Sequence, residues 1–185
     1  MMPPVTTVLV DRDGVLCVDT RQYIKSVEEL ILIPRSLEAV HRLALAGLPV
    51  VIISNQSGVG RGFLTQQTLD EVTNALLAAI REAGGEIAGV YYCPHTPEDD
   101  CPCRKPKPGL VRRAASELGF DPTRAVMVGD HLCDVQLAKA VGARSILVLT
   151  GQGAEQLEAA QAAPPDAVAE DLLAAVPLIL AWKGA

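Results

Sequence analysis

Carboxylate side chains follow two short hydrophobic segments of the sequence. Asp11 and Asp13 come directly after Val5–Val10, and Asp130 lies two residues after Ala125–Val128. Both segments are rich in β-branched residues and have the length of a strand. Carboxylate oxygens are the ligands that Mg²⁺, a hard cation, prefers in proteins. The pattern indicates a magnesium site at the ends of strands, although a solvated turn or a helix N-cap also accounts for a single acid.

A second group of polar residues has the chemistry of a phosphate site. Ser54 opens the turn Ser54–Gly58, where a hydroxyl and successive backbone amides can surround phosphate oxygens. Lys105 lies in the basic segment Arg104–Gly109, whose prolines stiffen the chain and help to orient a cation. Taken singly, these segments also fit a polar turn and a solvated basic patch. Their occurrence together with the acids favours transfer of a phosphoryl group.

Four potential metal ligands lie within eleven residues. Cys93, His95, Cys101 and Cys103 form a Cys-x-His…Cys-x-Cys set in a segment rich in Pro and Asp. Three thiolates and one imidazole suit a closed, tetrahedral Zn²⁺ site. The alternative is a set of unrelated free thiols, but free cysteines usually lie buried rather than in irregular segments. Because Cys103 directly precedes Arg104, a zinc ion bound here would also place the neighbouring cations.

The segments between these motifs alternate between strand-like and helix-like patterns. Strands are expected at Val5–Val10, Pro49–Ser54, Ile87–Tyr92, Ala125–Val128, Ser145–Leu149 and Ala167–Ala169. Helices are expected at Ser36–Ala46, at Thr65–Ala83 with Thr65 as N-cap, at Gly109–Leu118, at Asp134–Val141, and after the last strand. This alternation predicts the α/β class, with one doubly wound parallel sheet flanked by helices. The polar motifs would lie beyond the carboxyl ends of its strands.

Composition limits the classes of protein to which the chain can belong. Its 185 residues, 49% of them hydrophobic, are compatible with a single domain over residues 1–185. A net charge of −6 disfavours a nucleic-acid binder, and no hydrophobic run reaches the length of a membrane span. The start of the sequence has no secretory signal pattern. We expect a cytoplasmic protein, a monomer, with a small phosphorylated substrate.

The motifs occur in a recognisable order, which is Asp11-Arg12-Asp13, Ser54, Lys105 and the segment from Gly129 to Asp134. Together they resemble the haloacid dehalogenase (HAD) superfamily of phosphohydrolases, whose motifs read Asp-x-Asp, Ser/Thr, Lys and Gly-Asp-x-x-x-Asp. The resemblance implies that Asp11 is a nucleophile that forms an aspartyl-phosphate, and that Asp13 is the general acid and base. It implies that Ser54 and Lys105 hold the phosphoryl group. It also implies a Mg²⁺ ion bound by Asp130, the Asp11 carboxylate and the Asp13 backbone carbonyl.

The zinc pattern narrows the resemblance to a branch of the superfamily without a large cap domain. This branch includes D-glycero-D-manno-heptose 1,7-bisphosphate phosphatases and histidinol-phosphate phosphatases. The segments Asn55–Gly62 and Arg104–Gly109 look more like the heptose enzymes, whereas the five-residue gap between His95 and Cys101 is more similar to the histidinol-phosphate enzymes. The resemblance implies that the substrate is contacted by Asp19, Thr20, Arg21, Gln22, Asn55, Gln56, Ser57, Arg61 and Arg104. The last two arginines are candidates for binding a second phosphate.

Two alternatives to a phosphatase of heptose bisphosphate stay open at this point. Histidinol phosphate, an amino-alcohol phosphate with a cationic imidazole and amine, would suit an acidic pocket rim, for which Glu98, Asp99 and Asp100 are available. A catalytically dead, zinc-stabilised binding module is the second alternative, although the complete set of motif residues argues against it. Whether His131 or Asp134 contributes to the metal site is left undecided. Three further residues are interpreted as structural, namely Cys17, His41 and Cys133.

Overall fold

The strands of the protein form a parallel sheet. The computed structural model describes residues 3–184, and within this range six strands pair in the order β3-β2-β1-β4-β5-β6. All five pairings are parallel. The strands are β1 (Thr7–Val10), β2 (Val50–Asn55), β3 (Gly89–Cys93), β4 (Ala125–Gly129), β5 (Arg144–Val148) and β6 (Ala167–Ala169). This arrangement confirms the expected doubly wound α/β fold.

Both faces of the sheet are buried, which explains why its strands read as continuous hydrophobic runs. In β1, Val8 and Val10 belong to one hydrophobic cluster and Leu9 belongs to another. In β2, Ile52 packs in the cluster of Val8 and Val51 packs in the cluster of Leu9. Successive side chains of a strand point to opposite faces, so each strand supplies both halves of the core.

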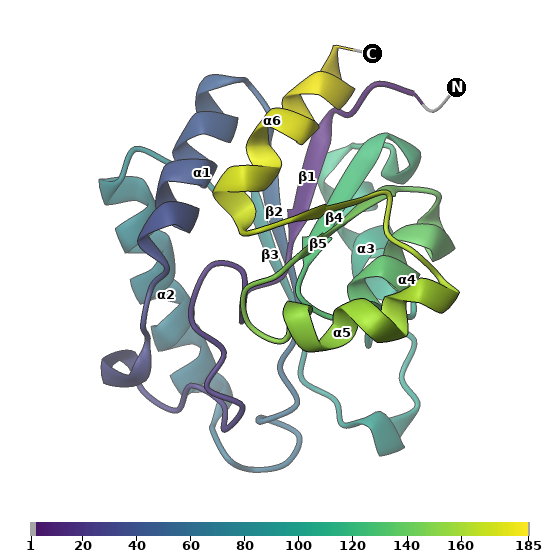
Figure 1. The fold of residues 1–185 in the computed structure, drawn as a ribbon. Coiled ribbons are helices and arrows are strands. Elements are labelled where there is room, and N and C mark those ends of the chain that lie inside the picture. The colour runs from purple at the N-terminus through teal and green to yellow at the C-terminus, as the bar shows by residue number, and fades with distance from the viewer. Residues whose placement is uncertain (1–2, 185) are drawn as a thin grey trace.

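Helices cover the two faces of the sheet, as Figure 1 shows. The cluster of Val8 includes residues of α1 (Pro34–Leu45), α2 (Gln66–Glu82) and α6 (Leu172–Lys183). The cluster of Leu9 includes residues of α3 (Gly109–Leu118) and α4 (Leu132–Val141). The remaining helices are α5 (Gly153–Ala159) and short 3₁₀ helices at Val27–Glu29, Pro97–Asp99, Pro122–Arg124 and Ala160–Ala162.

The N-caps of helices α2 and α4 can be compared with the residues expected at these positions. Thr65 is the N-cap of α2, as expected, and its hydroxyl accepts a hydrogen bond from the backbone N–H of Thr68 at 3.0 Å. Helix α4 begins at Leu132 with His131 as its N-cap, two residues before the expected start. Asp134 lies in the first turn, where its carboxylate accepts a hydrogen bond from the His131 backbone N–H at 3.3 Å. The N-cap alternative for the acids of this segment is therefore wrong.

Loops rather than a further domain follow β1 and β3 within the described range. The connection from β1 to α1 contains a 3₁₀ helix and isolated bridges that pair Cys17 with Asp13 and with Leu32. The connection from β3 to α3 contains the 3₁₀ helix Pro97–Asp99. In Figure 1 these connections gather at the lower end of the sheet, where the strands end. They can form the walls of a site without a large cap.

No helix between residues 3 and 184 combines the length and the hydrophobicity that crossing a lipid bilayer requires.

Candidate active site

The carboxyl ends of β1, β2 and β4 border a cavity of about 290 Å³. β1 pairs with β2 on one side and with β4 on the other, so the order of the strands along the chain reverses at β1. Ligands of open α/β sheets bind at such reversals. Five motif residues line this cavity, namely Asp11, Asp13, Ser54, Lys105 and Asp130.

The ammonium group of Lys105 links the motifs. Its Nζ lies 2.8 Å from Oδ2 of Asp11 and 2.7 Å from Oδ1 of Asp134, and it donates a hydrogen bond to the carbonyl oxygen of Ile53 at 2.9 Å. These three partners match the three N–H donors of an ammonium. Burial lowers the pKa of this lysine, but the charges of Asp11 and Asp134 outweigh burial and raise it. Lys105 is therefore held in its charged form.

The site has more negative than positive charge. Carboxylate oxygens of Asp11, Asp130 and Asp134 all lie within 4.8 Å of one another, and all three residues are buried. Burial, reinforced by the charge of Asp11, raises the pKa of Asp130 to about 8. Burial also raises the pKa of Asp134 to about 6, although Lys105 opposes this shift. A cluster of oxygen ligands with surplus negative charge fits a hard divalent cation such as Mg²⁺.

The backbone around Asp130 leaves no room for other side chains. A Cβ atom on Gly14 or on Gly151 would lie 2.1 Å from Oδ2 of Asp130. Both glycines have positive φ angles, 77° and 57°, which other residues adopt only with strain. The backbone N–H of Gln152 donates a hydrogen bond to the same Oδ2 at 2.8 Å. The loops after β1 and β5 thus fix the position of this carboxylate.

The end of β2 holds the backbone of Lys105. Oδ1 of Asn55 accepts a hydrogen bond from the Lys105 N–H at 3.0 Å, and Nδ2 of Asn55 donates to the Lys105 carbonyl at 3.2 Å. The backbone N–H of Gln56 donates to the carbonyl of Cys93 at 2.7 Å. These contacts join the turn after β2 to the segment after β3, which carries the sulfur ligands.

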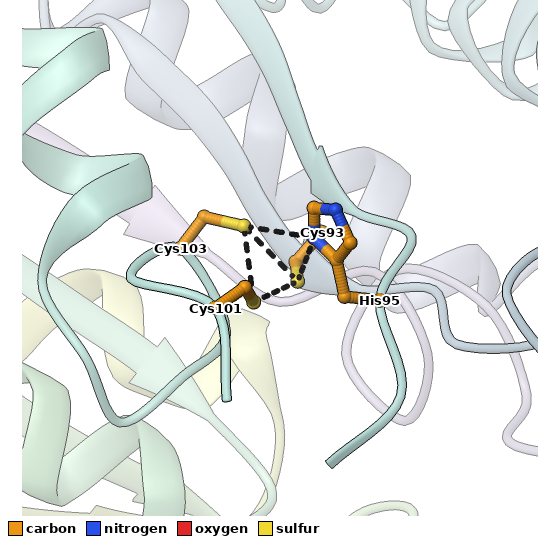
Figure 2. A group of neighbouring side chains, drawn as sticks. All are labelled: Cys93, His95, Cys101 and Cys103. Carbon is orange, nitrogen blue, oxygen red and sulfur yellow. Dashed lines mark hydrogen bonds between the residues drawn. The ribbon is translucent and has the colours of Figure 1, made fainter. Parts of the chain in front are cut away.

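Cys93, His95, Cys101 and Cys103 converge on one point, as Figure 2 shows. The Nδ1 atom of His95 lies 3.2 Å from Sγ of Cys103 and 3.6 Å from Sγ of Cys93. The sulfur atoms lie 3.3–3.5 Å apart, which is too far for a disulfide. Burial disfavours the Cys101 thiolate, but hydrogen bonds from Cys103 and nearby groups outweigh it and lower the pKa of Cys101 to about 7. This donor set can hold a metal ion.

Most residues expected to contact the substrate do line the cavity. These are Asp19, Thr20, Arg21, Asn55 and Arg104. Asp19 and Arg21 belong to a loop that also touches α5 and the segment before it. Oδ2 of Asp19 accepts a hydrogen bond from Nε2 of Gln152 at 2.8 Å, and the Arg21 guanidinium pairs with Glu155 at 2.5 Å.

Four expected substrate contacts are not among the lining residues of this cavity. Gln22 is exposed, and the guanidinium of Arg61 is directed to Glu98 at 3.8 Å. Gln56 and Ser57 are only 2% and 7% exposed, so they lie beneath the surface. Their hydrogen bonds go to other side chains of the protein, which makes them supporting residues in this structure.

The cavity wall also contains residues that the sequence patterns passed over. Tyr23 and Gln152 line it, as does His131, whose contribution was undecided. Cys133, interpreted as an ordinary packing residue, lines it as well. Cys17 is fully buried, as expected for a structural residue. The pattern Gly-x-Gly around Gln152 is the one sequence signal that could have indicated a close approach of backbone to the site.

Comparison with known proteins agrees with this geometry. A family model described as HAD-hydrolase-like matches residues 102–175. The D-glycero-β-D-manno-heptose-1,7-bisphosphate 7-phosphatase of Pseudomonas aeruginosa is 42% identical over 149 residues, which cover 80% of this chain and 84% of that protein. The protein of the same name from Bordetella bronchiseptica is 39% identical over 175 residues, which cover 94% and 97% of the two chains.

A solved structure of a heptose bisphosphate phosphatase is also similar to this chain. The crystal structure of the D,D-heptose 1,7-bisphosphate phosphatase from B. bronchiseptica, complexed with magnesium and phosphate, superimposes with a TM-score of 0.89. The two chains are 38% identical, and the match covers 96% of this chain and 99% of the other. The chain therefore belongs to the HAD-like hydrolases and, within them, to the family of D-glycero-D-manno-heptose-1,7-bisphosphate 7-phosphatases. The expected superfamily and the expected phosphatase class are confirmed.

The surplus of buried carboxylates predicts an unusual dependence of stability on pH. Without divalent cations, the free energy of unfolding should fall as pH rises from about 4 to about 8. In this window the native protein keeps a proton on Asp130 that the unfolded chain has lost, and a native state with more bound protons loses stability as pH rises. Urea unfolding at several pH values, with and without Mg²⁺, measures this slope.

Two comparisons sharpen that measurement. Saturating Mg²⁺ should restore the stability lost near pH 8, because the cation replaces the proton. The substitution Asp130→Asn should flatten the slope above about pH 6, because the amide does not titrate and the pKa of Asp134, about 6, places its contribution below that pH. An equal slope in the wild type and in this variant would contradict the assignment of the proton to Asp130.

Proposed function

We propose that the protein removes the 7-phosphate of D-glycero-D-manno-heptose 1,7-bisphosphate, with Asp11 as nucleophile and Mg²⁺ as cofactor. The observation that carries the proposal is the ion-paired triad in which Lys105 Nζ contacts both Asp11 and Asp134 at one edge of the cavity. The names of the relatives, which cover most of the chain, support the choice of substrate.

In the proposed reaction, an oxygen of Asp11 attacks phosphorus and forms an aspartyl-phosphate. Asp13 gives its proton to the departing ester oxygen, so that the sugar leaves as an alcohol. The Asp13 carboxylate then takes a proton from water, which attacks phosphorus and frees Asp11. Ser54 and Lys105 hold the phosphoryl oxygens throughout. All four side chains border the same cavity, which supports these roles.

The residues present fit a magnesium ion. Asp11 and Asp130 would hold it with their carboxylates, and Asp13 would contribute its backbone carbonyl. The ion would supply positive charge that offsets the repulsion between a carboxylate nucleophile and a phosphate dianion. Asp134, which pairs with Lys105 and lies in the first turn of α4, would position the lysine instead. Loss of one such preorganised contact typically raises the barrier by about 3–4 kcal/mol.

The second phosphate of the substrate requires cations at some distance from Asp11. Arg21 and Arg104 both line the cavity, and a guanidinium can bind a phosphate with two parallel hydrogen bonds. Arg104 is anchored by a hydrogen bond from its Nη1 to the carbonyl of His95 at 3.2 Å. We assign the distal phosphate to these two residues in place of the expected pair of Arg61 and Arg104.

Zinc is the metal proposed for the sulfur cluster of Cys93, His95, Cys101 and Cys103. Such a site would order a loop that contributes few residues to the hydrophobic core. Because Cys103 is two residues from Lys105, the ion would fix one end of the segment that presents the lysine, while Asn55 fixes its backbone.

Histidinol phosphate is the less favoured substrate. Its cationic end would need acidic residues at the rim, but the three candidates have other partners. Glu98 faces Arg61, Asp99 accepts a hydrogen bond from Thr96, and Asp100 pairs with Lys107. None of the three lines the cavity. The catalytically dead alternative is disfavoured because the nucleophile, the lysine and the acid cluster are all in place.

Phosphate release tests the proposed function directly. With Mg²⁺, kcat/KM for the heptose bisphosphate should exceed that for histidinol phosphate by about 10- to 100-fold, because a phosphate bound by Arg21 and Arg104 adds charge-assisted hydrogen bonds. Asp11→Asn should abolish both activities, whereas Asp70→Asn, an exposed site on α2, should leave them unchanged. Activity retained in Asp11→Asn, or a preference for histidinol phosphate, would contradict the proposal.

Removal of zinc tests the proposed role of the sulfur cluster. The purified protein should contain about one zinc ion per chain by elemental analysis. Chelation should lower kcat by about 10²-fold with Mg²⁺ in excess, because a shift of about 1 Å at Lys105 suffices for that loss. Added zinc should restore the rate. Full activity in a sample verified as free of zinc would reject the role.

A further inference from the structure

Arg12, the residue between the two motif aspartates, is buried in a way that the reaction as described does not explain. Its side chain is only 1% exposed, although it carries a charge. Its guanidinium forms hydrogen bonds with both carboxylate oxygens of Asp13. Nε and Nη2 donate to Oδ1 at 3.0 and 2.9 Å, and Nη2 also lies 2.9 Å from Oδ2. Such a fork fixes the plane of the carboxylate.

Gln56, the first residue after β2, completes this arrangement. Its Nε2 donates to Oδ2 of Asp13 at 2.7 Å, and its Oε1 accepts a hydrogen bond from Nη2 of Arg12 at 2.9 Å. The same Nε2 lies 3.1 Å from Oγ of Ser54. Gln56 therefore uses both ends of its amide inside the protein. It ties the Asp13 carboxylate to the residue expected to hold the phosphoryl group.

Arg12 also touches the nucleophile. Its backbone N–H donates to Oδ1 of Asp11 at 2.7 Å, while Oδ2 of Asp11 faces Lys105. The guanidinium lies 5.6 Å from the ring centre of Tyr92, and its Nη1 has no hydrogen-bond partner. Burial of a charge with an unpaired donor opposes folding. Such a group is more readily explained by a function at Asp13 than by a gain in stability.

The ion pair between Arg12 and Asp13 also means that the two cations of the site, Arg12 and Lys105, have different carboxylate partners. The ammonium of Lys105 already contacts Asp11, Asp134 and a backbone carbonyl. Because Arg12 supplies a separate counter-charge, Asp13 does not compete for that ammonium. Asp13 remains partly exposed to the cavity, with 27% of its side chain accessible. Its carboxyl group is thus held at the cavity wall but free of the phosphate-binding lysine.

We infer that Arg12 and Gln56 are positioning residues for Asp13, which aim its carboxyl group at the ester oxygen and later at water. The inference rests on the proposed function, in which Asp13 is the general acid and base. It makes a specific prediction about leaving groups. A sugar alkoxide must be protonated as the P–O bond breaks, whereas 4-nitrophenolate departs without a proton.

The test compares these two leaving groups. The variants are Arg12→Lys, which keeps the charge but loses the fork, and Gln56→Ala, which leaves Arg12 in place. With a sugar phosphate that the wild type hydrolyses, kcat should fall by about 10²-fold in both variants, while KM changes less than about threefold. With 4-nitrophenyl phosphate, the first turnover should keep its wild-type rate. It should appear as a burst of nitrophenolate, because only the later attack of water on the aspartyl-phosphate is slowed.

Arg144→Lys is the matched control. Arg144 likewise stacks on an aromatic ring, that of Trp182, at 4.8 Å and has an unpaired Nε, but it lies in β5 outside the cavity. This variant should show wild-type kinetics with both substrates. The loss of kcat in Asp13→Asn gives the upper limit for the loss that poor positioning of Asp13 can cause.

The outcomes separate the inference from the function on which it rests. Equal losses with both leaving groups and no burst, or no loss at all, would overturn the positioning role. A selective loss with a burst in Gln56→Ala would support it even if Arg12→Lys proves unstable. A wild type without Mg²⁺-dependent hydrolysis of either phosphate would instead overturn the proposed function.

Discussion

A single buried ammonium group organises the site. Lys105 Nζ holds Asp11 and Asp134 within 2.8 Å, yet a third buried carboxylate, Asp130, lies in the same cluster. One positive charge cannot balance three negative charges in a region of low dielectric constant. The site must therefore bind a proton or a further cation. This constraint links the raised pKa of Asp130, the expected magnesium ion and the attraction of a phosphate dianion to an acidic protein.

The fold supplies this cluster from three separate connections of the chain, those after β1, β3 and β4. β1 and β4 are neighbours, so Asp11 and Asp130 lie close together although they are 119 positions apart in the sequence. Lys105 lies on the segment after β3, a strand on the other side of β1 from β4. Its backbone N–H and carbonyl both form hydrogen bonds with the side chain of Asn55. The loops after β1 and β5 close over Asp130 with Gly14 and Gly151. Rigid strand ends thus carry the acids, while a tethered loop carries the cation.

The residues that sequence could predict are those fixed by the sheet. Hydrophobic runs locate Asp11, Ser54 and Asp130 at strand ends, and parallel strands bring their carboxyl ends to one edge. The spacing of Cys93, His95, Cys101 and Cys103 likewise predicts their convergence, since they form two pairs of near neighbours, at the end of β3 and before α3.

The residues whose location the sequence did not predict lie on irregular backbone, or have side chains whose direction depends on distant partners. Arg61 and Gln56 belong to the same turn, but the path of that turn directs Arg61 to Glu98 and Gln56 inward to Asp13. Cys133 lines the cavity from the first turn of α4, which starts two residues earlier than its hydrophobic pattern indicates. The burial of Arg12 depends on Gln56 and Tyr92, which lie 44 and 80 positions further along the chain.

The most direct test of the account is to trap the phosphorylated protein. Wild-type protein is mixed with substrate and Mg²⁺, quenched in acid within the first turnovers, reduced with borohydride and mapped by mass spectrometry. An aspartyl-phosphate is reduced to homoserine, and the account predicts this change at residue 11, with none when Mg²⁺ is omitted. Rapid hydrolysis with Asp11 left unmodified, or homoserine at another aspartate, would contradict it.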